Sequence, residues 1–365
     1  MDAGPAEGPG PGDGRVACEM GAVGSGNAET CRQGVAAASQ EGLALAVPPA
    51  ETSGRGTPSS SAGAVVSVAL GSAGWPRRVV LLGGTGFLGR ASEARLLRSG
   101  IPVLSMSSRD VDLAAASASE ALGRTLAEGD ALVFLSAVTR DKGRDAQTYL
   151  GNCAMAAHVA ASVRSNLAQV IYVSSDAVYG QASTLPISEE TPAAPDDLYG
   201  VMHLARELMF AEASTAAGVP YCVLRPTMVY GPGDTHGSYG PNRFFRTAPS
   251  GSLSLFGEGE ERRDFVYVED VAEIITRTIE RRATGVLNLA TGQSWTFASV
   301  ADMVVAACSM PVSVTRQPRA VPVVHRDFTS DATLRAFPDF RYTALDDGIR
   351  LTAAALFGGA PSNRA

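Results

Sequence analysis

The chain has 365 residues, of which 45% are apolar and 18% charged, and its formal net charge is −7. This acidic balance argues against a general nucleic-acid binder, which needs a basic face. No run of 18 apolar residues is present, so no membrane span is expected. No basic segment followed by an apolar run opens the chain, so we expect no secretory signal and a cytoplasmic location. The five cysteines are scattered and resemble neither a disulfide framework nor a zinc site.

Residues 1–75 are rich in Gly, Ala, Ser and Pro, and they contain seven acidic residues and three arginines. Apart from a weak apolar run at 62–70, they show neither helical nor strand periodicity. Such a segment buries too little surface to offset the entropy of ordering the chain, so we predict a disordered tail. A translation start assigned too early would give the same pattern.

From residue 76 onward, short β-branched runs alternate with helical stretches. Strands are predicted over 79–82, 103–106, 131–135, 170–174 and 221–224, and helices over 87–99, 147–165 and 199–217. In the last helix, an apolar stripe of Val201, Leu204, Leu208 and Met209 predicts the buried face. The alternation predicts an α/β fold with a Rossmann-type, doubly wound parallel sheet over 76–228. A smaller substrate-binding lobe is expected over 229–358, with 264–291 returning to the sheet.

A glycine-rich turn follows the first predicted strand, where Gly83, Gly86 and Gly89 have the spacing G-x-x-G-x-x-G. Glycine permits the sharp turn and the close approach of backbone to a pyrophosphate, and the following helix offers N–H groups and the positive end of its dipole. Because the motif lies between a strand and a helix, we predict that it binds a dinucleotide, with Phe87 and Leu88 beside the glycines.

The end of the second strand selects the cofactor in this fold. An acidic residue there binds the adenosine ribose, whereas an arginine suits a 2′-phosphate. The stretch 107–110 reads Ser-Ser-Arg-Asp, which places Arg109 in that region. We therefore favour NADP(H) over NAD(H). The opposite choice follows if Asp110, rather than Arg109, faces the ribose.

Four further motifs occur in chain order: SSDAVYG at 174–180, YGVMH at 199–203, RPTMVYGP at 225–232 and RDFVYVEDV at 263–271. With the glycine turn, they make the chain similar to the extended short-chain dehydrogenases/reductases, in the nucleotide-sugar NAD(P)-dependent epimerase/dehydratase family. The resemblance implies an NAD(P) cofactor, a nucleotide-sugar substrate and a homodimer. It places the cofactor also on Asp112, Leu113, Ser136, Asn152, Tyr199, His203 and Pro226.

By the same resemblance, Ser175 hydrogen-bonds the reacting oxygen and Tyr199 is the general acid or base. Free tyrosine has a pKa near 10, so the family places a lysine four residues on, whose charge favours the phenolate. Here His203 occupies that position, and only a protonated imidazole would supply the charge. Three interpretations stay open: His203 takes the lysine's role, the cation comes from elsewhere, or catalysis is weak or absent.

The chain has a single lysine, Lys142, and its other 29 basic residues are arginines. Lys142 follows the predicted strand 131–135, in a loop at the end of the sheet where ligands bind, so it is a candidate for a phosphate or substrate contact. Asp176 follows Ser175, as in the dehydratase branch, where an acid helps to expel water. Ala177 replaces the glutamate expected next to it, so an epimerase or keto-sugar reductase is favoured over a dehydratase.

The glycine- and proline-rich stretch 231–244 is predicted to be a loop that overhangs the substrate. Asn242, Arg243 and Arg263 are candidates for binding the nucleotide diphosphate, because arginine pairs well with phosphate. The four histidines lack ligand spacing, so no metal site is expected. The alternative function is a catalytically weak or inert NAD(P)-binding regulatory protein of the same fold.

Overall fold

Six parallel strands form the central sheet of the computed structural model, which describes Met1 and residues 68–182, 184–234 and 240–358. The strands are β1 (Arg78–Leu82), β2 (Val103–Met106), β3 (Asp130–Phe134), β4 (Gln169–Val173), β5 (Tyr221–Pro226) and β9 (Gly285–Leu289), in the spatial order β2-β1-β3-β4-β5-β9. The predicted doubly wound sheet is confirmed. Because β2 and β3 lie on opposite sides of β1, a ligand crevice is expected at the carboxyl ends of β1 and β3.

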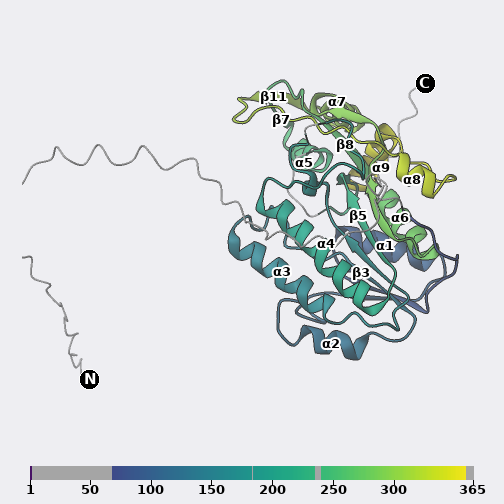
Figure 1. Cartoon of the computed structure of the whole chain (residues 1–365). Coiled ribbons are helices and arrows are strands. Elements are labelled where there is room, and N and C mark those ends of the chain that lie inside the picture. The colour runs from purple at the N-terminus through teal and green to yellow at the C-terminus, as the bar shows by residue number, and fades with distance from the viewer. Residues whose placement is uncertain (2–67, 183, 235–239, 359–365) are drawn as a thin grey trace, which may run out of the picture. The chain divides into compact units, whose positions relative to one another are not determined.

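Helices cover both faces of this sheet (Figure 1). The first face carries α1 (Phe87–Arg98) and α6 (Val268–Glu280), and the second carries α2 (Ala118–Thr125), α3 (Ala146–Ala160) and α4 (Leu198–Ala217). Successive side chains of a strand point to opposite faces, so Val79 packs with Leu96 on the first face, whereas Val80 packs with Leu122 and Phe210 on the second. Both faces are therefore apolar, as a covered parallel sheet requires.

The buried face of α4 differs from the predicted one. Val201 and Leu208, expected to be buried, are 37% and 65% exposed. The side chains that α4 buries include His203, Arg206 and Glu207. Leu204 and Met209, the other two residues of the predicted stripe, are partly buried and pack against the core. Hydropathy alone identified only part of the buried face, because the polar side chains are buried in a hydrogen-bonded network that stabilises them.

The C-terminal lobe combines two small sheets with three helices. One sheet contains β6 (Met228–Tyr230), β8 (Arg262–Tyr267) and β10 (Ser294–Thr296), and the other pairs β7 (Ser252–Phe256) with β11 (Ser313–Gln317). The helices are α5 (Pro241–Thr247), α7 (Phe297–Ala307) and α9 (Leu345–Phe357), and Phe244, Phe265 and Phe297 lie in the core between these elements. A short helix, α8 (Asp331–Ala336), packs near β9, and a 3-10 turn, η2 (Ala248–Ser250), follows α5.

Two stretches behave differently from their predictions. The end of the predicted loop 231–244 is helical, because Pro241 occupies the first position of α5, where proline's fixed φ and missing N–H suit a helix start. Residues 235–239 lie outside the described part. Most of the predicted disordered tail also lies outside it. The described end of that tail is held against the domain, since Ala69 pairs with Thr284 and the amide of Gly74 donates to the carbonyl of Glu280.

None of the helices in the described ranges is both long enough and apolar enough to cross a bilayer. Among the same residues, no group of three or more His, Cys, Asp or Glu side chains is arranged to hold a metal ion.

Candidate active site

The glycine turn brings the ends of β1 and β3 together. Gly83 has φ +94°, and a Cβ added there would lie 2.7 Å from Ser136 Oγ. A Cβ on Gly89 would lie 2.3 Å from the Gly83 carbonyl oxygen, so helix and strand approach more closely than any side chain permits. Helix α1 starts at Gly86 with no side-chain cap and no acidic residue in its first turn. This turn fits the pyrophosphate of a dinucleotide, because its backbone is accessible and its helix end is electropositive.

The turn after β2 contains Arg109 and Asp110, the two residues proposed to select the cofactor. The amide and hydroxyl of Ser107 both donate to Asp110 Oδ2 at 2.8 Å, and these bonds lower the pKa of Asp110. Asp110 and the neighbouring Arg109 are both exposed, but the Asp110 carboxylate is occupied in closing its own turn. Asp112 likewise accepts from the Ala114 amide at 3.0 Å, and Leu113 is buried in the core.

Asn152 and Arg206 brace the segment that follows β3. The Asn152 side chain accepts from the Val138 amide at 2.9 Å and donates to the Val138 carbonyl at 3.0 Å. Arg206 is fully buried and donates to the carbonyl oxygens of Ser136 and Asn152 at 2.7–2.9 Å. Because the Asn152 amide is engaged within the protein, it shapes the predicted cofactor site by fixing 136–138.

Tyr199 lies in the first turn of α4, next to a cavity of about 310 Å³ that it lines together with Val138, Arg140 and Asn152. The Arg140 guanidinium carbon lies 4.8 Å from the centroid of the Tyr199 ring. Its Nη2 atom is 2.6 Å from Asp197 Oδ2. Burial raises the pKa of Tyr199 to about 12, and the charge of Arg140 opposes that rise.

His203 lies one turn below Tyr199, with its ring edge toward the Tyr199 ring at a centroid distance of 4.6 Å. Its Nδ1 atom is 2.7 Å from the Tyr172 hydroxyl, and its Nε2 atom is buried with no hydrogen-bond partner among the described residues. Burial, with Arg206 and Arg140 nearby, holds the pKa of His203 well below 6.5. The imidazole is therefore neutral at pH 7.

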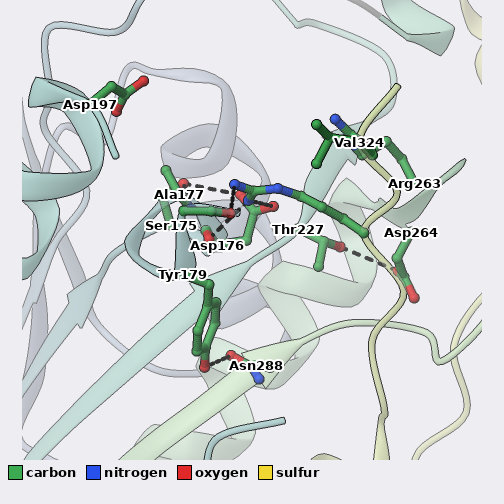
Figure 2. A network of polar contacts seen from close by, with 12 residues as sticks. Ser175, Asp176, Ala177, Tyr179, Asp197, Thr227, Arg263, Asp264, Asn288 and Val324 are labelled. Carbon is green, nitrogen blue, oxygen red and sulfur yellow. Dashed lines mark hydrogen bonds and ion pairs between the residues drawn. The ribbon is translucent and has the colours of Figure 1, made fainter. Parts of the chain in front are cut away.

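Ser175 and Asp176 lie at the start of the 3-10 turn η1 (Asp176–Tyr179), directly after β4 (Figure 2). The Ser175 hydroxyl accepts from the Ala177 amide at 3.2 Å and donates to Asp176 Oδ1 at 3.3 Å. Arg326, from the segment after β11, donates to Asp176 Oδ2 at 3.0 Å. A side chain of the C-terminal lobe thus reaches the residue next to Ser175.

The family motifs meet in a buried polar network beneath this turn. Glu207 accepts from the Ser174 hydroxyl at 2.6 Å and from Arg225 at 2.6 and 3.0 Å. Arg225 also donates to the Tyr179 hydroxyl at 2.9 Å. That hydroxyl in turn donates to Asn288 at 2.8 Å (Figure 2). The network ties α4 to β5, η1 and β9. Pro226, predicted to contact the cofactor, ends β5 in a buried position.

The predicted substrate residues differ in their surroundings, and of these Arg263 lies close enough to Asp176 and Arg326 for their charges to act on it (Figure 2). Lys142 is exposed, and it does not line the cavity beside Tyr199, as its neighbour Arg140 does. Asn242 accepts from the Gly231 amide at 3.1 Å, and the Arg243 guanidinium lies 5.9 Å from the Phe256 ring. Arg263 pairs with Glu261 and donates to the Val324 carbonyl. Both Asn242 and Arg263 therefore have protein partners within the lobe.

Sequence reasoning missed three arginines: Arg140, Arg206 and Arg326. Arg140 lies two residues before Lys142 in the same predicted loop, but it is outside the motifs of the family. Arg206 stands three residues after His203 on the same face of α4, so helical spacing could have identified it. Arg326 has no local signal, since it joins η1 across 150 residues of chain.

The chain matches the NAD dependent epimerase/dehydratase family over residues 79–290, more than half of its length, and it belongs to that family. It is 27% identical over 273 residues to a dTDP-6-deoxy-L-talose 4-dehydrogenase (NAD(P)(+)) of Kitasatospora kifunensis, covering 67% of this chain and 83% of the relative.

Two solved structures show the same fold. A GDP-L-fucose synthetase from Naegleria fowleri bound to NADP has a TM-score of 0.69 at 19% identity, covering 79% of this chain and 96% of that one. A UDP-glucose 4-epimerase from Thermus thermophilus in complex with NAD has a TM-score of 0.65 at 22% identity, covering 78% and 100%.

Proposed function

We propose that this enzyme is an NAD(P)-dependent oxidoreductase or epimerase that acts on a nucleotide-activated sugar, with Tyr199 as the proton-transfer residue. The main observation that supports the proposal is the close packing of α4 on η1. A Cβ on Gly200 would lie 2.4 Å from the Ala177 carbonyl oxygen, so only glycine permits this approach. That contact brings Tyr199 next to the turn that bears Ser175, beside the carboxyl ends of the parallel strands.

The bound dinucleotide would accept or supply hydride. The Ser175 hydroxyl would hydrogen-bond the reacting sugar oxygen, and Tyr199 would exchange its proton with that oxygen. Because burial raises the pKa of Tyr199 to about 12, the phenol keeps its proton at neutral pH. A protonated phenol suits reduction, in which it donates to the oxygen of a keto group, so we favour a keto-sugar reductase. An epimerase would also need the phenolate for its oxidising half-reaction.

NADP(H) is the favoured cofactor. Both side chains are exposed, but the Asp110 carboxylate already accepts from Ser107, so of the two it is Arg109 that can donate to a 2′-phosphate. The relatives include one protein bound to NADP and one bound to NAD, so the support for this choice comes from the turn itself.

A homodimer is the proposed assembly. Leu150 on α3 and Leu198, Val201 and Leu208 on α4 are between 37% and 65% exposed, and these two helices pack against each other. Exposed apolar side chains on adjoining elements are typical of a protein interface. A second copy of the chain would cover them. Light scattering on the purified protein tests this, and a monomer at micromolar concentration would contradict it.

The experiment that tests the function follows the absorbance of NADPH with a series of nucleotide 4-keto-sugars. We expect net oxidation of NADPH, whereas an epimerase would interconvert sugars with no net oxidation. Tyr199→Phe should reduce turnover by about 10²–10⁴-fold, the usual contribution of a general acid, while dinucleotide affinity is kept. Full turnover in this variant would contradict the proposed role of Tyr199 as a catalytic residue and would favour the regulatory alternative.

A further inference from the structure

We infer that Arg140 supplies, from the loop after β3, the positive charge beside Tyr199 that a lysine at position 203 would supply. The inference rests on the proposed function, because it gives Arg140 a task in proton transfer by Tyr199. It assigns a catalytic part to a residue outside the motifs of the family.

The geometry at position 203 excludes that residue as the source of charge. His203 is 3% exposed, and its Nδ1 atom is hydrogen-bonded to Tyr172. Burial and the nearby charges of Arg206 and Arg140 hold the pKa of His203 well below 6.5, so the imidazole is neutral at pH 7. His203 can offer a hydrogen bond to a ligand, but it carries no charge.

Arg140 is held against the Tyr199 ring by a second contact. Its ion pair with Asp197 fixes the guanidinium, and Asp197 is also the N-cap of α4, accepting from the Gly200 amide at 2.8 Å. The same carboxylate thus positions the cation and the helix turn that carries Tyr199. Arginine stays charged throughout the range in which enzymes work, so this charge does not depend on pH.

The charged groups that face Tyr199 are Arg140, Asp176, Arg206 and Asp197. Of the two arginines, Arg140 has the larger effect on the pKa of Tyr199. Its charge lowers that pKa, whereas the two carboxylates raise it. Arg206 is occupied with the carbonyl oxygens of Ser136 and Asn152, so it serves mainly as a brace.

Arg206 also accounts for the absence of lysine at position 203. It is a fully buried cation that has no carboxylate within ion-pair distance among the described residues. A lysine one turn away on the same buried face would place two desolvated positive charges together. The charge therefore has to come from outside the helix, where Arg140 stands with Asp197 as its counter-ion.

The test measures Tyr199 directly and needs no sugar substrate. Tyrosine labelled with ¹³C at Cζ is incorporated into the full chain, the protein is saturated with NADP⁺, and Tyr199→Phe identifies the Tyr199 resonance. As pH rises toward about 10.5, this resonance should begin to move toward the phenolate position, because about 3% of a phenol with a pKa of about 12 is ionised there. In Arg140→Gln the displacement should fall about tenfold, which corresponds to one pKa unit.

Arg140→Lys, which keeps the charge, should retain at least about half of the displacement, and Arg124→Gln on α2 should leave it unchanged. An equal displacement in wild type and Arg140→Gln would overturn the inference. If Tyr199→Phe loses turnover but Arg140→Gln leaves the displacement of the Tyr199 resonance unchanged, the proposed function holds and only the role of Arg140 is wrong. Full turnover in Tyr199→Phe would contradict both the proposed function and the role of Arg140.

Discussion

Nη1 of Arg326 lies 3.0 Å from Oδ2 of Asp176, which joins the segment after β11 to the turn beside Ser175. The same guanidinium donates to the carbonyl oxygens of Asp176 and Gly180. Both side chains are less than one-fifth exposed, so these bonds form in a region largely shielded from water. Arg326 thus fixes the position of Asp176 relative to the C-terminal lobe.

Replacing Arg326 with glutamine should therefore destabilise the protein by about 2 kcal/mol, because the Asp176 carboxylate loses its charged partner and two carbonyls lose donors. The matched control is Arg262→Gln, whose partner Asp327 is more exposed, and it should cost at most about 1 kcal/mol. Urea unfolding measures both values. Equal losses would show that Arg326 is an ordinary surface residue.

The ion pair between Glu207 and Arg225 is more deeply buried, since both side chains are 8% exposed or less. Glu207→Gln should destabilise the protein by about 3–5 kcal/mol, because it leaves the Arg225 charge without a carboxylate. Replacing both residues, as Glu207→Gln with Arg225→Met, should cost less than the two single losses combined. Urea unfolding of the four proteins gives the coupling free energy between Glu207 and Arg225, and a value near zero would contradict this prediction. Glu269→Gln, in an exposed pair with Arg98, is the control.

The fold was predictable from the sequence because strand and helix periods report burial directly. The same reasoning failed on α4, where it assigned Val201 and Leu208 to the interior. That interior face bears Arg206, which donates to carbonyl oxygens distant in sequence, and Glu207, which is ion-paired with Arg225. Hydropathy treats each residue alone and so cannot register such contacts.

The candidate site shows the same limit. Ser175 and Tyr199 could be proposed as catalytic residues from the sequence because their motifs are local. Arg140 was missed because its role depends on the cavity that the loop after β3 shares with α4, and no spacing within the chain encodes that contact. Asn242 was expected to bind substrate, but its side chain accepts from the Gly231 amide.

Asp270 gives the protein a pH-dependent stability. Burial raises its pKa to about 6, although its two oxygens accept from the amide and hydroxyl of Thr343 at 2.8 Å each. A raised folded pKa means that the stabilising proton is present below the unfolded value of 3.8 and is lost as pH rises through about 6. This loss should amount to about 3 kcal/mol at most.

Asp270→Asn keeps both hydrogen bonds, since its oxygen can accept from the Thr343 amide and its NH₂ can donate to the Thr343 hydroxyl. The variant should therefore lose less stability than wild type between pH 4 and pH 7. Thermal unfolding across this range measures the difference. Parallel pH curves for the two proteins would rule out Asp270 as the source.

Arg109 provides a test of cofactor choice. Arg109→Ala should weaken NADP⁺ binding by about 10- to 100-fold, the worth of a hydrogen-bonded charge, while NAD⁺ affinity changes little. Isothermal titration with each dinucleotide gives the two constants, and Arg124→Ala on α2 controls for the general loss of a positive charge. An unchanged ratio of the two affinities would remove Arg109 as the reader of the 2′-phosphate.

Gly89 tests whether close approach of the backbone, rather than flexibility, makes the glycine turn a dinucleotide site. A methyl group there would meet the carbonyl oxygens of Gly83 and Gly84 at 2.3 and 2.5 Å, and neither can move without shifting the turn. Gly89→Ala should therefore abolish dinucleotide binding and lower stability. Gly151→Ala is the control, because its Cβ meets nothing within 4 Å in the interior of α3. It should stabilise the protein by about 0.5–1 kcal/mol, since alanine loses less entropy in a helix. Retained dinucleotide affinity in Gly89→Ala would show that the turn tolerates a side chain and that the cofactor binds elsewhere.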